Sequence, residues 1–150
     1  MHGHEDIIDD RVLKPLLFSM GYEKRDIIPK PSITHAIIGG NNSRGRREPD
    51  KGILPYRTVH RPTKDGKTKL VSLFGMVVDT KQLGTMLTPH MEEKLTGYCA
   101  LLGSFYGLLT NGDQLVIVKP KLGIIDWEYA TTIPTKSDLM KELAARPPSY

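Results

Sequence analysis

Three charged residues stand where two apolar stretches of the sequence meet polar segments. Asp79 and Lys81 follow the apolar run Leu70–Val78, and Asp50 precedes a second apolar stretch. Because side chains alternate along a strand, Asp79 and Lys81 are expected on the same face. Two carboxylates together with a substrate phosphate are a usual way to hold Mg²⁺, which prefers oxygen ligands. A metal ion held there would lower the pKa of a bound water and offset charge developing on a phosphate.

An acidic residue two positions before a lysine is a common pattern and is not specific by itself. It occurs here at Asp65-Gly66-Lys67, Asp79-Thr80-Lys81 and Glu92-Glu93-Lys94. The first is a hairpin-turn signal and the third is expected on a solvent-facing helix surface. The second ends an apolar run, where a charged group is costly without a partner or a purpose. From the residues alone, a structural Asp79–Lys81 ion pair and a metal site stay open as equal alternatives.

The positive charge of the chain is concentrated in one segment. The net charge is +4 over 150 residues, but Arg44–Lys69 contains nine basic and three acidic residues and carries +6. The rest of the chain therefore carries −2. A positive field from one segment indicates a polyanionic partner, of which nucleic acid is the commonest. Charge alone leaves open a solvated basic loop with no partner.

Composition and length restrict the class of protein. The chain is 39% hydrophobic and 25% charged, as in ordinary soluble globular proteins, and its length favours one domain over residues 1–150 with a frayed tail at 146–150. The single cysteine, Cys99, excludes a disulfide scaffold and is expected to be a small core residue. No apolar run is long enough to span a bilayer, so we expect a cytoplasmic protein without membrane contact.

The elements that must position the charged residues follow from hydrophobic periodicity and turn signals. A first helix is expected over Glu5–Met20, with Pro15 kinking it or shifting its start. The other expected elements are strands at Ile33–Ile38, Gly52–His60 and Leu70–Val78, a helix at Pro89–Leu102 closed by Gly103, strands at Phe105–Thr110, Gln114–Lys119 and Ile124–Tyr129, and a helix at Lys136–Ala145. This order predicts an α/β fold with a central mixed sheet flanked by helices.

Several short motifs occur in a characteristic order between Asp10 and Lys119. They are Arg11–Leu17 with Met20-Gly21-Tyr22, Arg47–Asp50, Asp65-Gly66-Lys67, Val77–Lys81, Leu95–Gly103 and Tyr106–Gly112. In this order they resemble the N-terminal nuclease domain of type I restriction enzyme R subunits, a branch of the PD-(D/E)xK nuclease superfamily. The resemblance implies a restriction-endonuclease-like αβββαβ core with a basic loop and hairpin insertion at about 40–69.

The resemblance also implies a Mg²⁺-dependent DNA endonuclease, with Mn²⁺ as a substitute. It assigns Asp50 and Asp79 as metal ligands and Lys81 as the residue that positions the attacking water. Glu5 is the candidate for a further ligand from the first helix, with a charge favoured by the helix dipole as the alternative. The residues expected to contact DNA are Arg44, Arg46, Arg47, Arg57, Arg61, Lys94 and Tyr98. The implied partners are DNA and other restriction-modification subunits, and the oligomeric state is left open.

Two departures from the family pattern favour a second interpretation. Lys94 stands where the family has a glutamine four residues before Tyr98, and a lysine cannot reproduce an amide's paired donor and acceptor. In addition, 28 residues separate Asp50 from Asp79, more than the family usually shows. The alternative is therefore a catalytically inactive nuclease-fold module for DNA binding or assembly.

Overall fold

The structure, a computed structural model, describes residues 9–31, 49–121 and 126–145. Along the chain the elements are η1 (Asp9–Leu13), α2 (Lys14–Ser19), η2 (Lys24–Asp26), β1 (Ile27–Pro29), β2 (Lys51–Pro62), β3 (Thr68–Thr80), α3 (Pro89–Leu102), β4 (Tyr106–Thr110), β5 (Leu115–Pro120), β6 (Trp127–Ala130) and α4 (Lys136–Ala145). The six strands form one sheet in the order β1-β2-β3-β4-β5-β6. β3 and β4 are parallel, and every other neighbouring pair is antiparallel.

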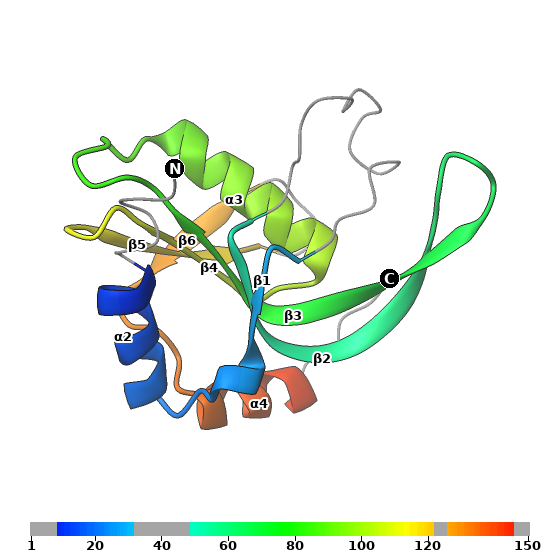
Figure 1. The fold of residues 1–150 in the computed structure, drawn as a ribbon, viewed down its shortest axis with the longest axis horizontal. Coiled ribbons are helices and arrows are strands. Elements are labelled where there is room, and N and C mark those ends of the chain that lie inside the picture. Colours follow the sequence, from blue (N-terminus) through cyan, green and yellow to red (C-terminus); the bar gives the residue numbers. More distant parts are fainter. Residues whose placement is uncertain (1–8, 32–48, 122–125, 146–150) are drawn as a thin grey trace.

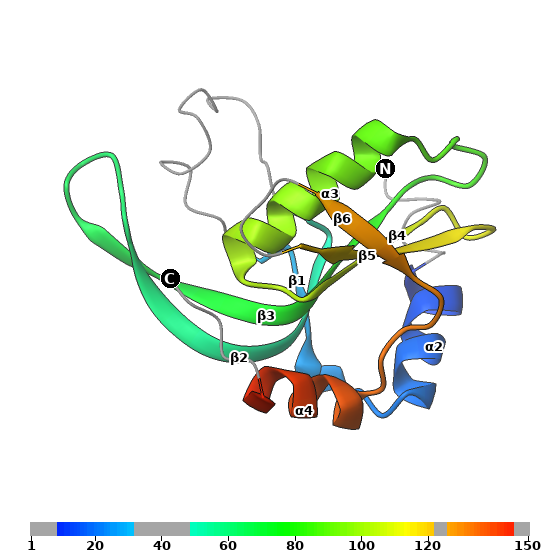
Figure 2. The same cartoon turned by 180° about the vertical axis from the view of Figure 1, so that it is seen from behind.

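Helices cover both faces of this mixed sheet. Figures 1 and 2 show α3 on one side, with α2 and α4 on the other. α3 is the crossover between the parallel strands β3 and β4, as a parallel pair requires. The predicted α/β fold with a central mixed sheet flanked by helices is confirmed.

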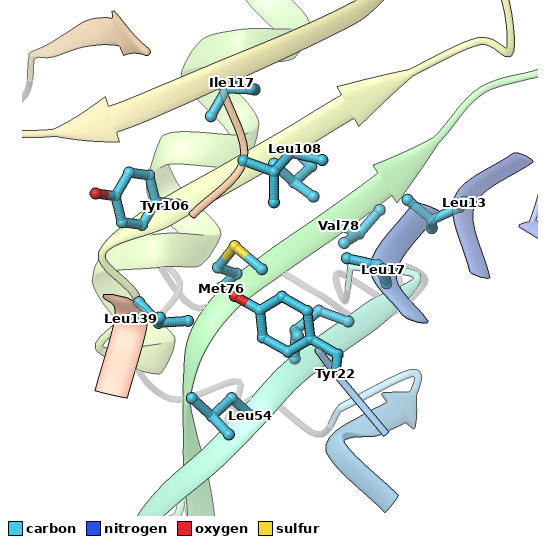
Figure 3. Close-up of a cluster of buried hydrophobic side chains, with 12 residues drawn as sticks. Leu13, Leu17, Tyr22, Leu54, Met76, Val78, Tyr106, Leu108, Ile117 and Leu139 are labelled. Atoms are coloured by element: carbon cyan, nitrogen blue, oxygen red, sulfur yellow. The ribbon is translucent and has the colours of Figure 1, made fainter. Parts of the chain in front are cut away.

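Consecutive residues of the central strands fill two separate cores. Val78 and Leu108 belong to the cluster that packs against α2 and α4, whose side chains Figure 3 shows. Val77 and Leu109, one position away, belong to the cluster under α3. This alternation is the period of two that a sheet covered on both faces requires. Both clusters together explain why the apolar run before Asp79 is continuous.

α3 lies close against β4 because of a glycine. A Cβ on Gly107 would lie 2.8 Å from Cγ of Leu95 and 3.0 Å from Sγ of Cys99, so only glycine allows this approach. Cys99 is buried there, as its sequence context predicted. Burial raises the pKa of its thiol far above the ordinary value, which makes it an inert core residue.

The N-terminal helix differs from the continuous helix expected over residues 5–20. Its described part is a π-helical turn, η1, followed by α2, which has Pro15 in its first turn. Proline is tolerated there because that position has no intrahelical partner for its N–H. Pro15 thus shifts the start of the α-helix, one of the two outcomes expected for it. The residues before Asp9 lie outside the described part of the chain.

The two later helices have the predicted bounds. The Thr88 hydroxyl accepts a hydrogen bond from the Met91 N–H at 3.3 Å at the start of α3, and Gly103 ends the helix in the left-handed region at φ 63°. The expected strand Ile33–Ile38 lies outside the described residues, and the first described strand is β1, just before it. No helix in the described ranges is long and apolar enough to cross a membrane.

β2 and β3 form a long hairpin that bends near its middle. Ile53 and Leu54 both face the α2/α4 cluster, and Leu54 has a φ of 61°, so β2 loses its alternation there. The register then shifts between Pro55 and Arg57, which is a β-bulge. Beyond the bulge the hairpin continues as a curved ribbon that leaves the body of the molecule (Figure 1).

Candidate functional site

The register of β2 and β3 brings Asp50 and Asp79 together. Lys51 pairs with Val78, so the next step of the antiparallel ladder places Asp50 opposite Asp79. Oδ2 of Asp50 accepts a hydrogen bond from the Thr80 N–H at 2.6 Å, which ties the carboxylate to the end of β3. The 28 residues between the two aspartates therefore do not separate them, because the hairpin folds back on itself.

Asp79 and Lys81 lie in direct contact, as expected for residues on one face of a strand. Nζ of Lys81 is 3.0 Å from Oδ2 of Asp79, and the two side chains are 26% and 13% exposed. The Lys81 N–H donates to the carbonyl of Thr110 at 2.7 Å, which continues the pairing of β3 with β4. The ammonium group is thus fixed at the carboxylate yet reaches solvent.

The backbone around Asp50 is held from the other side by the chain that follows β1. The Lys30 N–H donates to the carbonyl of Asp50 at 2.8 Å, while the Asp50 carboxylate binds the backbone of β3. Asp50 is therefore anchored to both neighbouring strands although it lies just before β2. Such anchoring reduces the freedom of a ligand side chain and so favours a defined geometry.

The two carboxylates provide the hard oxygen ligands that Mg²⁺ prefers, and Mg²⁺ usually takes only one or two protein carboxylates. Among the described residues, no three His, Cys, Asp or Glu side chains lie close enough together to hold a metal ion. Glu5, the expected third acidic residue, lies outside the described ranges. The described residues therefore offer two carboxylates, Asp50 and Asp79, at this end of the hairpin.

The loop after Lys81 is held next to the site by Asn111. Nδ2 of Asn111 donates to the carbonyl of Thr85 at 2.8 Å, and its Oδ1 accepts from the N–H groups of Asp113 and Gln114 at 2.9 and 2.8 Å. The buried amide thus joins the β4–β5 turn to the β3–α3 loop. Asn111, which belongs to the Tyr106–Gly112 motif of the sequence, thus has a structural role in holding these two loops together.

The two α3 residues expected at DNA have different surroundings. Lys94 is exposed on the helix surface. Tyr98 is buried in the cluster under α3, together with Leu95 and Cys99, and only 7% of it is exposed. Tyr98 thus contributes to the core under α3, and its predicted contact with DNA stays a prediction.

Glu92, predicted on a solvent-facing helix surface, is instead buried, and that prediction is wrong. Oε1 of Glu92 accepts hydrogen bonds from Nε1 of Trp127 at 3.2 Å and from the Tyr129 hydroxyl. These two donors stand on one face of β6, and their contact ties the last strand to α3. Donation to the carboxylate raises the pKa of Tyr129. The signal in the sequence was the aromatic pair Trp127 and Tyr129 at strand spacing.

The remaining predicted DNA contacts lie on the hairpin or outside the described residues. Arg57 and Arg61 are on the outer part of β2, beyond the bulge. Arg44, Arg46 and Arg47 lie outside the described ranges. The turn predicted at Asp65-Gly66 is present, and Oδ1 of Asp65 accepts from the Thr63 hydroxyl and from the Lys67 N–H. These two hydrogen bonds hold the pKa of Asp65 below its ordinary value, and the bond from the Thr63 hydroxyl has the larger effect on the pKa.

No protein-family model and no curated protein sequence matches this chain. Among solved structures, the chain is similar to a fragment assigned to an HsdR subunit of a type I restriction enzyme from Vibrio vulnificus YJ016. The TM-score is 0.54 at 19% sequence identity, over 94% of this chain and 25% of the other. What the two share is a fold. The chain spans about a quarter of the length of that fragment.

Proposed function

We propose that this chain is a restriction-endonuclease-like domain that hydrolyses phosphodiester bonds in DNA with Mg²⁺, for which Mn²⁺ can substitute. The observation that carries the proposal is the assembly of Asp50, Asp79 and Lys81 at the paired ends of β2 and β3. The fold shared with an HsdR fragment supports a restriction-modification context, in which other subunits of such a system are the expected protein partners.

The order of the described elements supports the proposed core. A helix, three strands, a helix and a strand, from α2 to β4, follow one another as in the expected αβββαβ arrangement. The acidic pair stands where the second and third of these strands end side by side. We include residues 1–150 in this one proposed domain.

In the proposed reaction, Asp50 and Asp79 hold the ion and Lys81 aligns the attacking water. When bound, Mg²⁺ lowers the pKa of a coordinated water and offsets negative charge on the phosphate. Lys81 contributes an ammonium group that contacts Asp79 and solvent at once, so it can hold a water molecule beside the carboxylate. The Thr80 N–H donates to Oδ2 of Asp50 and so fixes the position of this carboxylate at the end of β3.

A second candidate is a catalytically inactive module that binds DNA or assembles with other subunits. The observation that favours it is the Asp79–Lys81 contact itself, because an ion pair satisfies both charges without a metal. Lys94 in place of glutamine agrees with this candidate.

Cleavage of supercoiled plasmid by the purified chain separates the two candidates. Wild type with Mg²⁺ or Mn²⁺ is expected to nick the plasmid, and Asp79→Asn is expected to reduce the rate by at least about 100-fold. Asp113→Asn is the matched control, because Asp113 is exposed in the β4–β5 turn and makes the same change of charge. Absence of cleavage by wild type with both metals, or equal cleavage by Asp79→Asn, contradicts the nuclease proposal.

A further inference from the structure

The outer part of the β2–β3 hairpin extends beyond the rest of the sheet. β1 pairs only with residues 51–53 of β2, and β4 pairs only with residues 76–80 of β3. Residues 57–62 of β2 and 68–73 of β3 pair only with each other in the described sheet. Figures 1 and 2 show this ribbon curving away from the body, towards the side that α3 covers. We call residues 57–73 the hairpin arm.

The hairpin arm carries a dense positive charge. Its charged residues are five cations, Arg57, Arg61, Lys64, Lys67 and Lys69, and a single carboxylate, Asp65. The arm alone therefore carries +4, as much as the whole chain. Asp65 closes the turn at the tip through its bonds to Thr63 and Lys67, so its position serves the turn. Such a field attracts a polyanion along the whole length of the arm.

Several of these cations lie on one face of the ribbon. Arg61 and Lys69 are directly opposite each other in the ladder, a position in which like charges repel. Arg57 lies on the same face, two and four positions from Val59 and Arg61. Neighbouring cations on one face of a ribbon can contact successive phosphates of a bound polyanion.

The cationic face is the one that looks towards α3. Val59 and Val71 are opposite each other, and both pack with the cluster under α3. Since side chains alternate, Arg61 and Lys69 share the face of these two valines. The arm curves towards that same side (Figure 2), so its concave surface is the charged one.

The same strand connects the arm to the candidate site. β3 runs without interruption from Lys69 to Asp79, ten residues away, which is a contour of about 33 Å. A DNA duplex rises about 3.4 Å per base pair, and because the ribbon curves, this contour sets an upper limit of about ten base pairs, or one helical turn, on the reach of the arm from the site. The candidate site lies at the end of β3 that carries Asp79, and the arm lies towards the other end of the same strand. The arm therefore extends to one side of the site only.

We propose that the hairpin arm holds the backbone of double-stranded DNA within about one helical turn, to one side of the phosphodiester bond at Asp79. This rests on the proposed nuclease function and adds the form and length of its substrate. Lysine and arginine contacts to phosphates fix the position of a duplex without reading its sequence. The arm contains no Phe, Tyr or Trp, the side chains on which single-stranded bases stack, which favours a duplex.

Binding measured without cleavage tests the arm separately from the nuclease. The Asp79→Asn chain is titrated into a labelled 30-base-pair duplex at several salt concentrations, followed by fluorescence anisotropy. Adding Arg61→Gln and Lys69→Gln should weaken binding about tenfold and lower the salt slope by about two. Lys121→Gln with Lys141→Gln removes the same charge from exposed positions elsewhere and should change the affinity less than twofold. Equal effects of the two pairs overturn the proposal.

The position of cleavage then tests the distance. On end-labelled duplexes of 12 to 40 base pairs, wild type should leave a margin of several and at most about ten base pairs uncut. On each strand this margin should lie at the same end, either the 5′ or the 3′ end. The Arg61→Gln, Lys69→Gln chain should lose this margin. Cuts that reach both ends in wild type, or tighter binding to single-stranded DNA or to an RNA duplex, overturn the proposal. Wild type that binds through the arm and never cuts refutes only the nuclease function.

Discussion

The two ends of the β2–β3 hairpin are built differently although they belong to the same two strands. At the site end, β1 and β4 flank the pair, and Ile53, Met76 and Val78 are fully buried. At the arm, each strand pairs only with the other, and Leu70 is 60% exposed, although Val71 and Leu73 at the base of the arm are buried. The carboxylates are thus fixed by core packing, whereas the cations are displayed on an exposed ribbon. A site that holds a metal needs the first kind of support, and backbone contacts tolerate the second.

Activity should depend on the two ends in different ways. Lys81→Gln is expected to lower kcat between about 10²- and 10⁴-fold, because a positioned catalytic group is lost. Arg61→Gln is expected to raise KM and leave kcat unchanged, because it removes a backbone contact. Initial rates at varied DNA concentration measure both, with Lys121→Gln as the control. A loss of kcat in Arg61→Gln would show that the arm acts in the chemical step.

Stability should be concentrated at the site end. Leu108→Ala, in the cluster against α2 and α4, is expected to cost about 3 kcal/mol of unfolding free energy, because it leaves a cavity. Leu70→Ala, on the exposed arm, should cost less than about 0.5 kcal/mol. Urea unfolding followed by circular dichroism compares the two. Similar costs would mean that the arm packs as tightly as the core.

The repulsion within the arm should be removable. Lys69→Glu places a carboxylate opposite Arg61 and is expected to stabilise the hairpin by about 0.5 kcal/mol, since it converts repulsion into attraction. The same change should weaken DNA binding. Hydrogen exchange of the arm amides measures the first effect and anisotropy the second. Lys67→Glu, at the tip and outside the ladder, is the control for charge alone.

The smallest effect concerns the tip of the arm. The carboxyl of Asp65 should titrate below its ordinary pKa, because the Thr63 hydroxyl and the Lys67 N–H stabilise its charged form. Because the pKa of Asp65 is lower in the folded chain than in the unfolded chain, the charged carboxylate stabilises the turn at any pH above its pKa in the unfolded chain. This stabilisation is lost as the pH falls through the pKa of Asp65 in the folded chain. A carbon-13 titration should show the shift, and Thr63→Val should reduce it. An unshifted titration in wild type would contradict the hydrogen bonds that Asp65 accepts in the turn.

Elements with strong local signals could be predicted from the sequence. The bounds of α3 were readable because apolar spacing, Pro89 and Gly103 mark a helix whatever its surroundings, and those of α4 also agree with the sequence prediction. β1 was missed because Pro29 and Pro31 suggest an interruption, and the strand ends at the first of them. The bulge at Leu54 has no sequence signal, since a leucine rarely adopts a positive φ.

The meeting of Asp50 and Asp79 was expected from the strands that they flank, and the position of the turn between them is a further physical signal for it. Asp65 lies 15 residues after Asp50 and 14 before Asp79, so a hairpin folded at Asp65-Gly66 returns the chain to its starting point. The register that makes this work depends on one bulge, which local patterns do not reveal. Glu92 was misjudged because its partners are 35 and 37 residues away.

The close fit of α3 on Gly107 gives the molecule a chemical reporter of its own opening. The lone thiol, Cys99, lies in the dry contact between α3 and β4. A thiol reagent can reach Cys99 only when α3 moves away from β4, so the rate of modification reports how often this local opening occurs. Slower labelling on adding DNA or Mg²⁺ would mean that the ligand holds helix and sheet together.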